Sequence, residues 1–303
     1  MFKYTLDNKR YHTLNYHMRE MFGTRVFKAV IDGGFSCPNK ESGGCTYCRE
    51  GSGFFTGEGS ITQQLEKETE RIHKKWGEKP IIAYFQANTN TYADVDELRA
   101  KYEEALKFEG VVGLSIATRA DCLGDDVIKL LDEINKKTYL TVELGLQSVK
   151  DETAVKINRG YDFKVFEKSF YELKKHNIRT VVHIINGLID EMREDMINTA
   201  KVLSKMEPDG VKIHSLHVLN GTRCCDEYYE GKLKMLSQEE YIDITVNQIR
   251  LFKEECVIER VTGDGEKENM VAPRWSLDKI STLGGIDKLF AELNAYQGDL
   301  YES

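Results

Sequence analysis

Three cysteines stand close together in one glycine-rich stretch, at Cys37, Cys45 and Cys48. Thiolates ligate both zinc and iron–sulfur clusters, so this stretch indicates a metal centre. A closed structural zinc site usually takes four ligands, and no fourth Cys or His lies at finger-like spacing. The alternative is a four-iron cluster, in which three local thiolates leave one iron open to a further ligand. The interpretation without a metal is that the three cysteines cluster by chance or pack in a core.

The other four cysteines carry no such pattern. Cys122 and Cys256 are isolated, and Cys224 and Cys225 are adjacent in the chain. We interpret all four as ordinary buried thiols. Because the total of seven is odd and the N-terminus has no apolar signal segment, we do not expect disulfides.

Several polar residues interrupt apolar segments. Glu143 and Gln147 are four residues apart and therefore share one face of an expected strand. A carboxylate inside a buried strand is costly unless it is paired or used. Histidines 183, 214 and 217 also interrupt apolar runs, where a satisfied core residue is as good an interpretation as a cavity-lining one.

The elements that must position these residues alternate along the chain. Short, nearly continuous apolar runs predict buried parallel strands. They cover residues 26–31, 81–85, 111–117, 139–146, 179–185 and 211–218. Apolar residues at spacings of three and four predict helices between them. These helices cover residues 61–76, 95–108, 127–134, 163–173 and 194–206.

Six βα units in succession predict an α/β fold with a partial (βα)6 barrel, and an open doubly wound sheet is the alternative. After them we expect a helix at 237–255, a strand at 257–261 and a last helix at 286–293. We divide the chain into a basic and aromatic N-terminal segment (1–25), the barrel (26–220) and a short α/β extension packed on it (221–303).

The motif Cys-x7-Cys-x-Tyr-Cys after a first strand resembles the radical S-adenosylmethionine (radical SAM) superfamily. Its first gap is longer than the common Cys-x3-Cys-x2-Cys spacing, a feature shared with the elongator catalytic subunit. Within the superfamily, the chain resembles the YhcC/YtqA-type bacterial family. The segments that carry this resemblance are HTLNYHMREMFGTRVFKAVIDGGFSCPN, YFQANTNTY, VELGLQS, INRG and APRWS.

The resemblance implies a [4Fe-4S] cluster held by Cys37, Cys45 and Cys48, whose open iron binds S-adenosylmethionine (SAM). An electron from the cluster would cleave SAM to a 5′-deoxyadenosyl radical, which abstracts a hydrogen atom from the substrate. Other positions match residues that contact SAM or line its cavity in related enzymes. They are Tyr47, Asn88, Thr89, Thr118, Glu143, Gln147, Arg159, His183 and His217.

The chain departs from the family at two of these places. Asn88 and Thr89 replace part of a Gly-rich turn that meets the amino group of SAM. The turn after the fifth strand reads Gly187-Leu188-Ile189-Asp190-Glu191 and lacks the usual proline and second glycine near the adenine.

The resemblance also implies a substrate, the side chain of a wobble uridine in tRNA, and a flavodoxin- or ferredoxin-like electron donor. The net charge of −8 excludes a general nucleic-acid coat but not a local basic patch. Such a patch is expected in the N-terminal segment, where Lys9, Arg10 and Arg25 accompany aromatic residues. We expect a cytoplasmic protein, with no apolar stretch long enough to cross a membrane.

Two other functions fit the same residues. The radical chemistry could act on a small metabolite or a protein side chain, which the acidic charge favours. Alternatively, the cluster could sense iron or redox state without catalysis, and then Gln147 and Arg159 would have no cofactor to contact.

Overall fold

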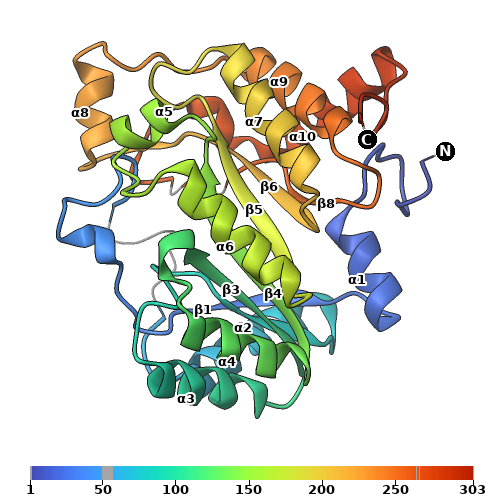
Figure 1. Cartoon of the computed structure of the whole chain (residues 1–303). Helices are drawn as coiled ribbons and strands as arrows, with labels where there is room; N and C mark the ends of the chain where they lie inside the picture. The colour runs from blue at the N-terminus through green and yellow to red at the C-terminus, as the bar shows by residue number, and fades with distance from the viewer. Residues whose placement is uncertain (1, 50–56, 264, 266, 303) are drawn as a thin grey trace.

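The computed structural model describes residues 2–49, 57–263, 265 and 267–302. In this part of the chain a curved sheet of seven parallel strands runs through the molecule (Figure 1). In order across the sheet the strands are β1 (Phe27–Ile31), β2 (Ile81–Phe85), β3 (Val111–Arg119), β4 (Tyr139–Gln147), β5 (Arg179–Asn186), β6 (Gly210–Ser215) and β8 (Val257–Arg260).

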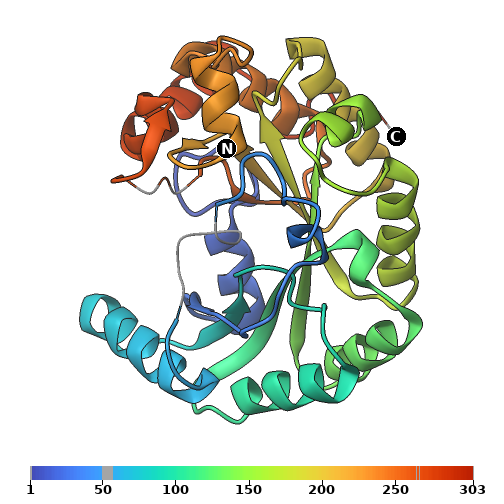
Figure 2. The same cartoon turned by 90° about the vertical axis from the view of Figure 1, so that its left-hand side faces the viewer.

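Helices cover the outer face of this sheet, and the two edge strands, β1 and β8, are not paired with each other (Figure 2). The expected partial parallel barrel is therefore confirmed, and the open doubly wound alternative is wrong. The helices are α1 (Leu14–Phe22), α2 (Ile61–Trp76), α3 (Val95–Leu106), α4 (Asp125–Asn135), α5 (Asp151–Lys156), α6 (Phe163–Lys175), α7 (Arg193–Met206), α8 (Arg223–Tyr229), α9 (Gln238–Leu251) and α10 (Lys279–Glu292).

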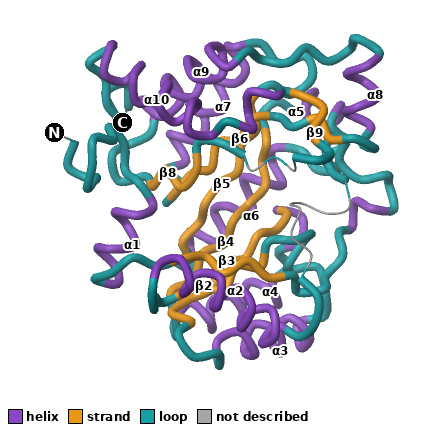
Figure 3. Tube along the Cα trace, turned by 180° about the vertical axis from the view of Figure 1, so that it is seen from behind, coloured by secondary structure: helices purple, strands orange, loops and turns teal. Residues whose placement is uncertain are grey.

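Local sequence explains where these elements begin. All five residues of β2 are buried, as expected for a parallel strand covered on both faces. Ser60 and Gln63 form a capping box at the start of α2, and Asp162 caps α6 through the amide of Val165. Seen from behind, α9 lies above the strands and α3 lies below them (Figure 3).

The part of the chain after residue 220 contributes a strand to the barrel sheet and is not only packed against it. β8 pairs in parallel with β6, from Gly210 with Val257 onward, and so continues the same sheet. A second, two-stranded sheet of β7 (Val218–Leu219) and β9 (Met270–Ala272) lies beside α8. His217 falls between β6 and β7 and not on strand six, because the strand ends at Ser215.

The N-terminal segment lies at the end of the barrel where the strands begin. The amide of Ile258 donates to the carbonyl of His12 at 2.8 Å, and His17 Nε2 lies 3.0 Å from the hydroxyl of Tyr139, the first residue of β4. Figure 1 shows α1 at the end of the molecule away from α5 and α8. None of the described helices is both long and apolar enough to cross a membrane.

Candidate functional site

A cavity of about 930 Å³ lies where the barrel strands end. The loop after β1 and the ends of β2 to β6 contribute to its wall. Every residue that the sequence and its resemblance proposed for the site lines this cavity. They are Cys37, Cys45, Tyr47, Cys48, Asn88, Thr89, Thr118, Glu143, Gln147, Arg159, His183 and His217. Residues spread over most of the chain are thus brought to one place.

The cysteine loop begins with a short 3-10 helix, Pro38–Lys40, directly after Cys37. Gly43 and Gly44 then take positive φ angles of 89° and 70°, which a glycine adopts without steric cost. The amide of Gly44 donates to the carbonyl of Asn39 at 2.7 Å, and this bond closes the turn that leads to Cys45. The loop thereby directs all three thiols into the cavity.

Cys45 and Cys48 differ in acidity. A hydrogen bond from the Cys48 thiol, with the positive charge of Arg119 and a hydrogen bond from Tyr47, lowers the pKa of Cys45 to about 6, although burial opposes the shift. The same contact and burial raise the pKa of Cys48. A Cys45 thiolate therefore forms readily near neutral pH, which is the state that binds iron.

The spacing of the thiols bears on which metal they can hold. Within the described residues, no three His, Cys, Asp or Glu side chains are close enough to share a single metal ion. Three thiols are too few for the four ligands of a closed structural zinc site, and three thiolates are the local ligands that a four-iron cluster with one open iron would need.

Two residues at strand ends adopt backbone conformations that are uncommon for residues other than glycine. Asn88, after β2, has a φ of 60°, and Gln147, at the end of β4, has a φ of 63°. The Oε1 atom of Gln147 is buried and accepts no hydrogen bond from the described residues. Strained residues with an unsatisfied polar atom in a cavity are typical of ligand sites.

Glu143 is the centre of a buried polar network on the barrel interior. Its Oε1 accepts hydrogen bonds from Lys28 and Ser115, both at 2.6 Å. Its Oε2 lies 2.8 Å from the hydroxyl of Tyr84 and 2.7 Å from His183 Nε2. Burial alone would raise the pKa of Glu143, but the nearby ammonium groups hold it well below its usual range. The carboxylate is therefore satisfied by protein groups.

Lys212, on β6, is the member of this network that the sequence analysis missed. Its ammonium group forms a short ion pair with Glu143, and it also lines the cavity. Burial lowers the pKa of Lys212 to about 7, despite the neighbouring carboxylate, and the charge of Lys28 adds to the effect. A lysine in the apolar run VKIHS was the available signal, because an unpaired ammonium is as costly there as the Glu143 carboxylate.

Arg159 is held mainly by backbone carbonyls. Its Nη1 donates to the carbonyls of Leu146 at 2.6 Å and Ser148 at 2.7 Å, and its Nε donates to that of Tyr161 at 2.9 Å. Its Nη2 makes no hydrogen bond within the described residues, with Asp151 at 3.7 Å. One nitrogen of a nearly fully buried guanidinium therefore remains for a ligand.

The remaining polar residues of the wall are partly used by the protein. Thr118 shares a hydrogen bond with Thr91, with the two hydroxyl oxygens 2.5 Å apart. Arg119 pairs with Asp121 at 2.7 Å. Burial lowers the pKa of His183 and also lowers that of His217, to about 4, so both rings are neutral near pH 7.

The other four cysteines are free thiols that do not line the cavity. Cys224, Cys225 and Cys256 are buried, and Cys122 is half-buried. Burial raises the pKa values of Cys122 and Cys224 to about 12, which keeps both protonated. These features agree with their interpretation as ordinary thiols.

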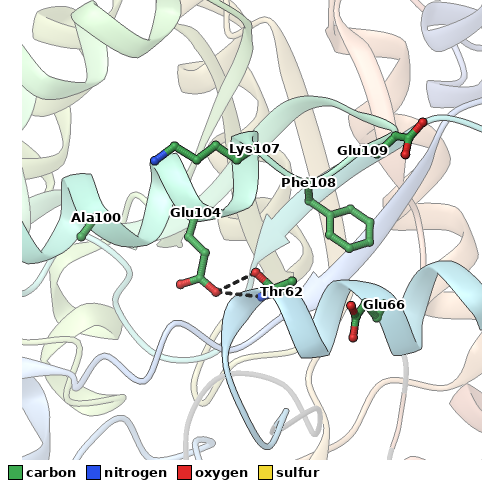
Figure 4. A pocket seen from close by; sticks show the side chains of 7 residues that line it. All are labelled: Thr62, Glu66, Ala100, Glu104, Lys107, Phe108 and Glu109. Carbon is green, nitrogen blue, oxygen red and sulfur yellow. Dashed lines mark hydrogen bonds between the residues drawn. The ribbon is translucent and has the colours of Figure 1, made fainter.

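A second hollow of about 400 Å³ lies on the outer side of the barrel, between α2 and α3 (Figure 4). Glu104 accepts hydrogen bonds there from the amide and the hydroxyl of Thr62, at 2.9 and 3.0 Å. The other residues that line this hollow are Glu66, Ala100, Lys107, Phe108 and Glu109. None of the residues that the sequence proposed for the site lies in it.

Comparisons with known proteins show the family to which the chain belongs. The model of the radical SAM superfamily matches residues 35–203, and that of the radical SAM C-terminal domain matches residues 208–292. The protein YtqA of Bacillus subtilis is 47% identical over 99% of this chain and 96% of its own length. The protein YhcC of Escherichia coli is 31% identical over 89% of each chain.

The fold also resembles solved structures. An archaeal Elp3 from Methanocaldococcus infernus superposes with a TM-score of 0.70 at 17% sequence identity, over 90% of this chain and 64% of that one. Part of this likeness extends to sequence, since Elongator complex protein 3 of Mus musculus is 27% identical over 54% of this chain and 30% of its own length.

Proposed function

This chain belongs to the radical SAM superfamily and to the family of YtqA and YhcC within it, and from this premise we propose that it modifies the side chain of a wobble uridine in tRNA. Proteins of the superfamily bind a [4Fe-4S] cluster and SAM, and this chain is a radical SAM enzyme. We propose Cys37, Cys45 and Cys48 as the cluster ligands, since all three line the cavity and no other cysteine does among the described residues.

For SAM we propose the residues at the strand ends. Gln147 offers an unsatisfied amide oxygen, and Arg159 offers one nitrogen that makes no other hydrogen bond. Asn88, Thr89, Thr118, Tyr47, Glu143, His183 and His217 complete the wall. When bound, the cluster and SAM together supply a one-electron route to breaking a C–H bond of the substrate.

The chain's own residues bind and orient the cofactors and the substrate, and they exclude water from the cavity. The cysteine loop shields the cluster side of the cavity. The Glu143 network fixes the side chains of Tyr84, His183 and Lys212 on the barrel interior. Because Lys212 has a pKa of about 7, it can give or take a proton at Nζ near neutral pH.

The charge of the cavity wall is the observation that favours an RNA substrate. Seven of the lining residues are Lys or Arg and two are Glu, although the whole chain carries a net charge of −8. Four of the seven are paired with carboxylates, namely Arg71 with Glu68, Arg119 with Asp121, Arg159 with Asp151 and Lys212 with Glu143, and the residues that line the cavity still include more basic than acidic side chains. A positive cavity in an acidic protein suits a polyanion and argues against a neutral metabolite.

The N-terminal segment does not support this proposal as the sequence suggested. It lies at the opposite end of the barrel, and its charges are used locally. Lys9 pairs with Asp287, Arg10 donates to the carbonyl of Ala295, and Arg25 stacks on Trp76 at 4.3 Å. The geometry therefore favours the cavity over this segment as the surface that holds tRNA.

Two measurements test the proposal. Nucleosides of tRNA from a strain lacking the gene should show an altered wobble uridine by mass spectrometry. Binding of tRNA to the reconstituted protein should weaken steeply with added salt. The double variant Lys40→Glu with Arg71→Glu should bind more weakly and with a smaller salt dependence, because both side chains line the mouth.

The matched control is Lys129→Glu with Lys205→Glu, which makes the same charge change at exposed positions of α4 and α7 outside the cavity. Equal loss of binding in both variants would mean that overall charge, and not this cavity, attracts the RNA. A normal wobble-uridine profile in the null strain, with no tRNA affinity, would favour a small-molecule or protein substrate. Absence of SAM cleavage by the reduced protein would leave only a sensor function.

A further inference from the structure

Asn39 is buried directly beside the cysteine that carries the lowered pKa. Its Nδ2 lies 3.5 Å from the Sγ of Cys45 and donates to the carbonyl of Asn158 at 2.6 Å. Because the carbonyl of Asn158 can only accept, it fixes which side of the amide is the nitrogen, and Oδ1 then accepts a hydrogen bond from Ser42 at 2.8 Å. Both amide hydrogens are therefore directed, one of them at a thiol sulfur.

The segment Asn158–Gly160 packs directly against this amide. Asn158 Nδ2 donates to the carbonyls of Ser42 at 3.0 Å and Gly44 at 2.7 Å, so it ties down the turn that carries Asn39. Gly160 has a φ of 87°, and a Cβ there would lie 2.8 Å from Asn39 Oδ1. The glycine therefore leaves the space that the Asn39 amide occupies.

We propose that Asn39 is a positioning residue that tunes the cluster through an N–H···S hydrogen bond to Cys45. The inference rests on the assignment of Cys45 as a cluster ligand made above. An N–H donor withdraws electron density from a ligating sulfur and so stabilises the reduced, more negative form of the cluster. Asn39 thereby makes it easier for a one-electron donor to reduce the cluster by one electron, a step in which no bond forms or breaks.

The test uses the full chain with its cluster reconstituted under anaerobic conditions. Asn39→Leu keeps the branching and the number of side-chain heavy atoms and removes the donor. Its cluster should have a lower midpoint potential than wild type in a redox titration followed by electron paramagnetic resonance, with iron and sulfide content unchanged. The matched control is Ser42→Ala, which removes hydrogen bonds from the same loop but none to a sulfur.

An unchanged potential in Asn39→Leu with a full cluster would overturn the proposal. An equal shift in Ser42→Ala would overturn it too, because relaxation of the loop would then be the cause. If Asn39→Leu fails to hold iron, wild-type protein labelled with ¹⁵N-asparagine still decides: the reduced cluster should show a hyperfine coupling to an asparagine nitrogen, and its absence would refute the contact.

The proposal can fail without the ligand assignment failing. Loss of iron from Cys45→Ala, together with an unshifted potential in Asn39→Leu, would keep Cys45 as a ligand and remove Asn39 as a tuning residue. Full iron content in Cys45→Ala would instead overturn the ligand assignment itself.

Discussion

At the scale of single residues, the structure separates charges that the protein uses internally from those it leaves for a ligand. Glu143 drew attention because a carboxylate inside a strand needs a partner, and it has partners on five other strands: Lys28, Tyr84, Ser115, His183 and Lys212. Arg159 spends two of its three nitrogens on backbone carbonyls. The apolar surroundings of Glu143 made it conspicuous in the sequence, and the family resemblance pointed to Arg159, but only the contacts tell what each is paired with.

The cysteine motif gives a direct residue-scale prediction. Changing Cys37, Cys45 or Cys48 to Ala should abolish the binding of about four irons and four sulfides per chain, because each thiolate holds a different iron. Iron and sulfide analysis after anaerobic reconstitution measures this. Cys122→Ala is the matched control, since Cys122 lies outside the cavity wall and should leave the cluster intact. A cluster retained in the triple motif variant would show that the ligands are elsewhere.

Lys212 gives a pH-dependent prediction. Its pKa is lowered from 10.5 to about 7 by burial, so between these values the unfolded chain binds a proton that the folded chain does not. The free energy of unfolding should therefore rise with pH from about 7 to 10 through this group. Lys212→Met removes the group, and the stability difference between wild type and variant should grow in favour of wild type over that range.

Denaturant titrations of both proteins at several pH values measure this difference. Other groups titrate equally in the two proteins and cancel. A stability difference that does not change with pH would mean that Lys212 keeps its proton in the folded state. Lys212 would then not act as an acid or base in the cavity near neutral pH.

At the scale of elements, regular patterns were predictable and close packing was not. The expected helix at 61–76 has the observed bounds of α2, where apolar spacing and the Ser60 cap agree. The helix expected at 286–293 begins earlier, at Lys279, because Gly284 and Gly285 hid its first turns. Gly285 is required by packing: a Cβ there would lie 2.4 Å from Ile242 Cδ1 on α9. Such contacts between elements have no periodic signal in the sequence.

The absence of a sequence signal for contacts between distant elements also explains why the position of the N-terminal segment was not predicted. Its basic and aromatic composition could be read from the sequence, but its position under the barrel depends on pairing with β8, far along the chain. The resemblance to a family placed the cavity residues correctly because it supplied such long-range information.

The placement of this segment gives an element-scale prediction. Arg25→Glu should leave tRNA affinity and its salt dependence unchanged, because Arg25 lies at the end of the barrel away from the cavity. It should lower the free energy of unfolding by roughly 0.5–1 kcal/mol, since the guanidinium stacks on Phe27 and Trp76. Filter binding and denaturant titration measure the two effects. Loss of tRNA affinity without loss of stability would return the segment to the binding surface.

At the scale of the whole molecule, the barrel and the region after it form one structure. β8 supplies the seventh strand, and α9 and α10 pack against each other beside α7. Glu259 on β8 reaches into the barrel interior and pairs with Lys28 on β1 and Arg179 on β5, each at 2.8 Å. One carboxylate thus links the two edge strands of the open sheet with its middle.

This link gives the last prediction. Glu259→Gln keeps the size of the side chain but leaves the cations of Lys28 and Arg179 with less compensating charge in a buried place. The expected cost is on the order of 3 kcal/mol in the free energy of unfolding, because breaking a buried ion pair strands its partner. The matched control is Glu254→Gln, whose pair with Lys3 is largely exposed and whose loss should cost far less. Denaturant titration compares the two. Equal, small costs would show that Glu143 alone suffices to neutralise the interior, and that β8 is held by its backbone pairing with β6. A large cost for Glu259→Gln alone would show that the sheet edge and the cavity floor depend on the same charge.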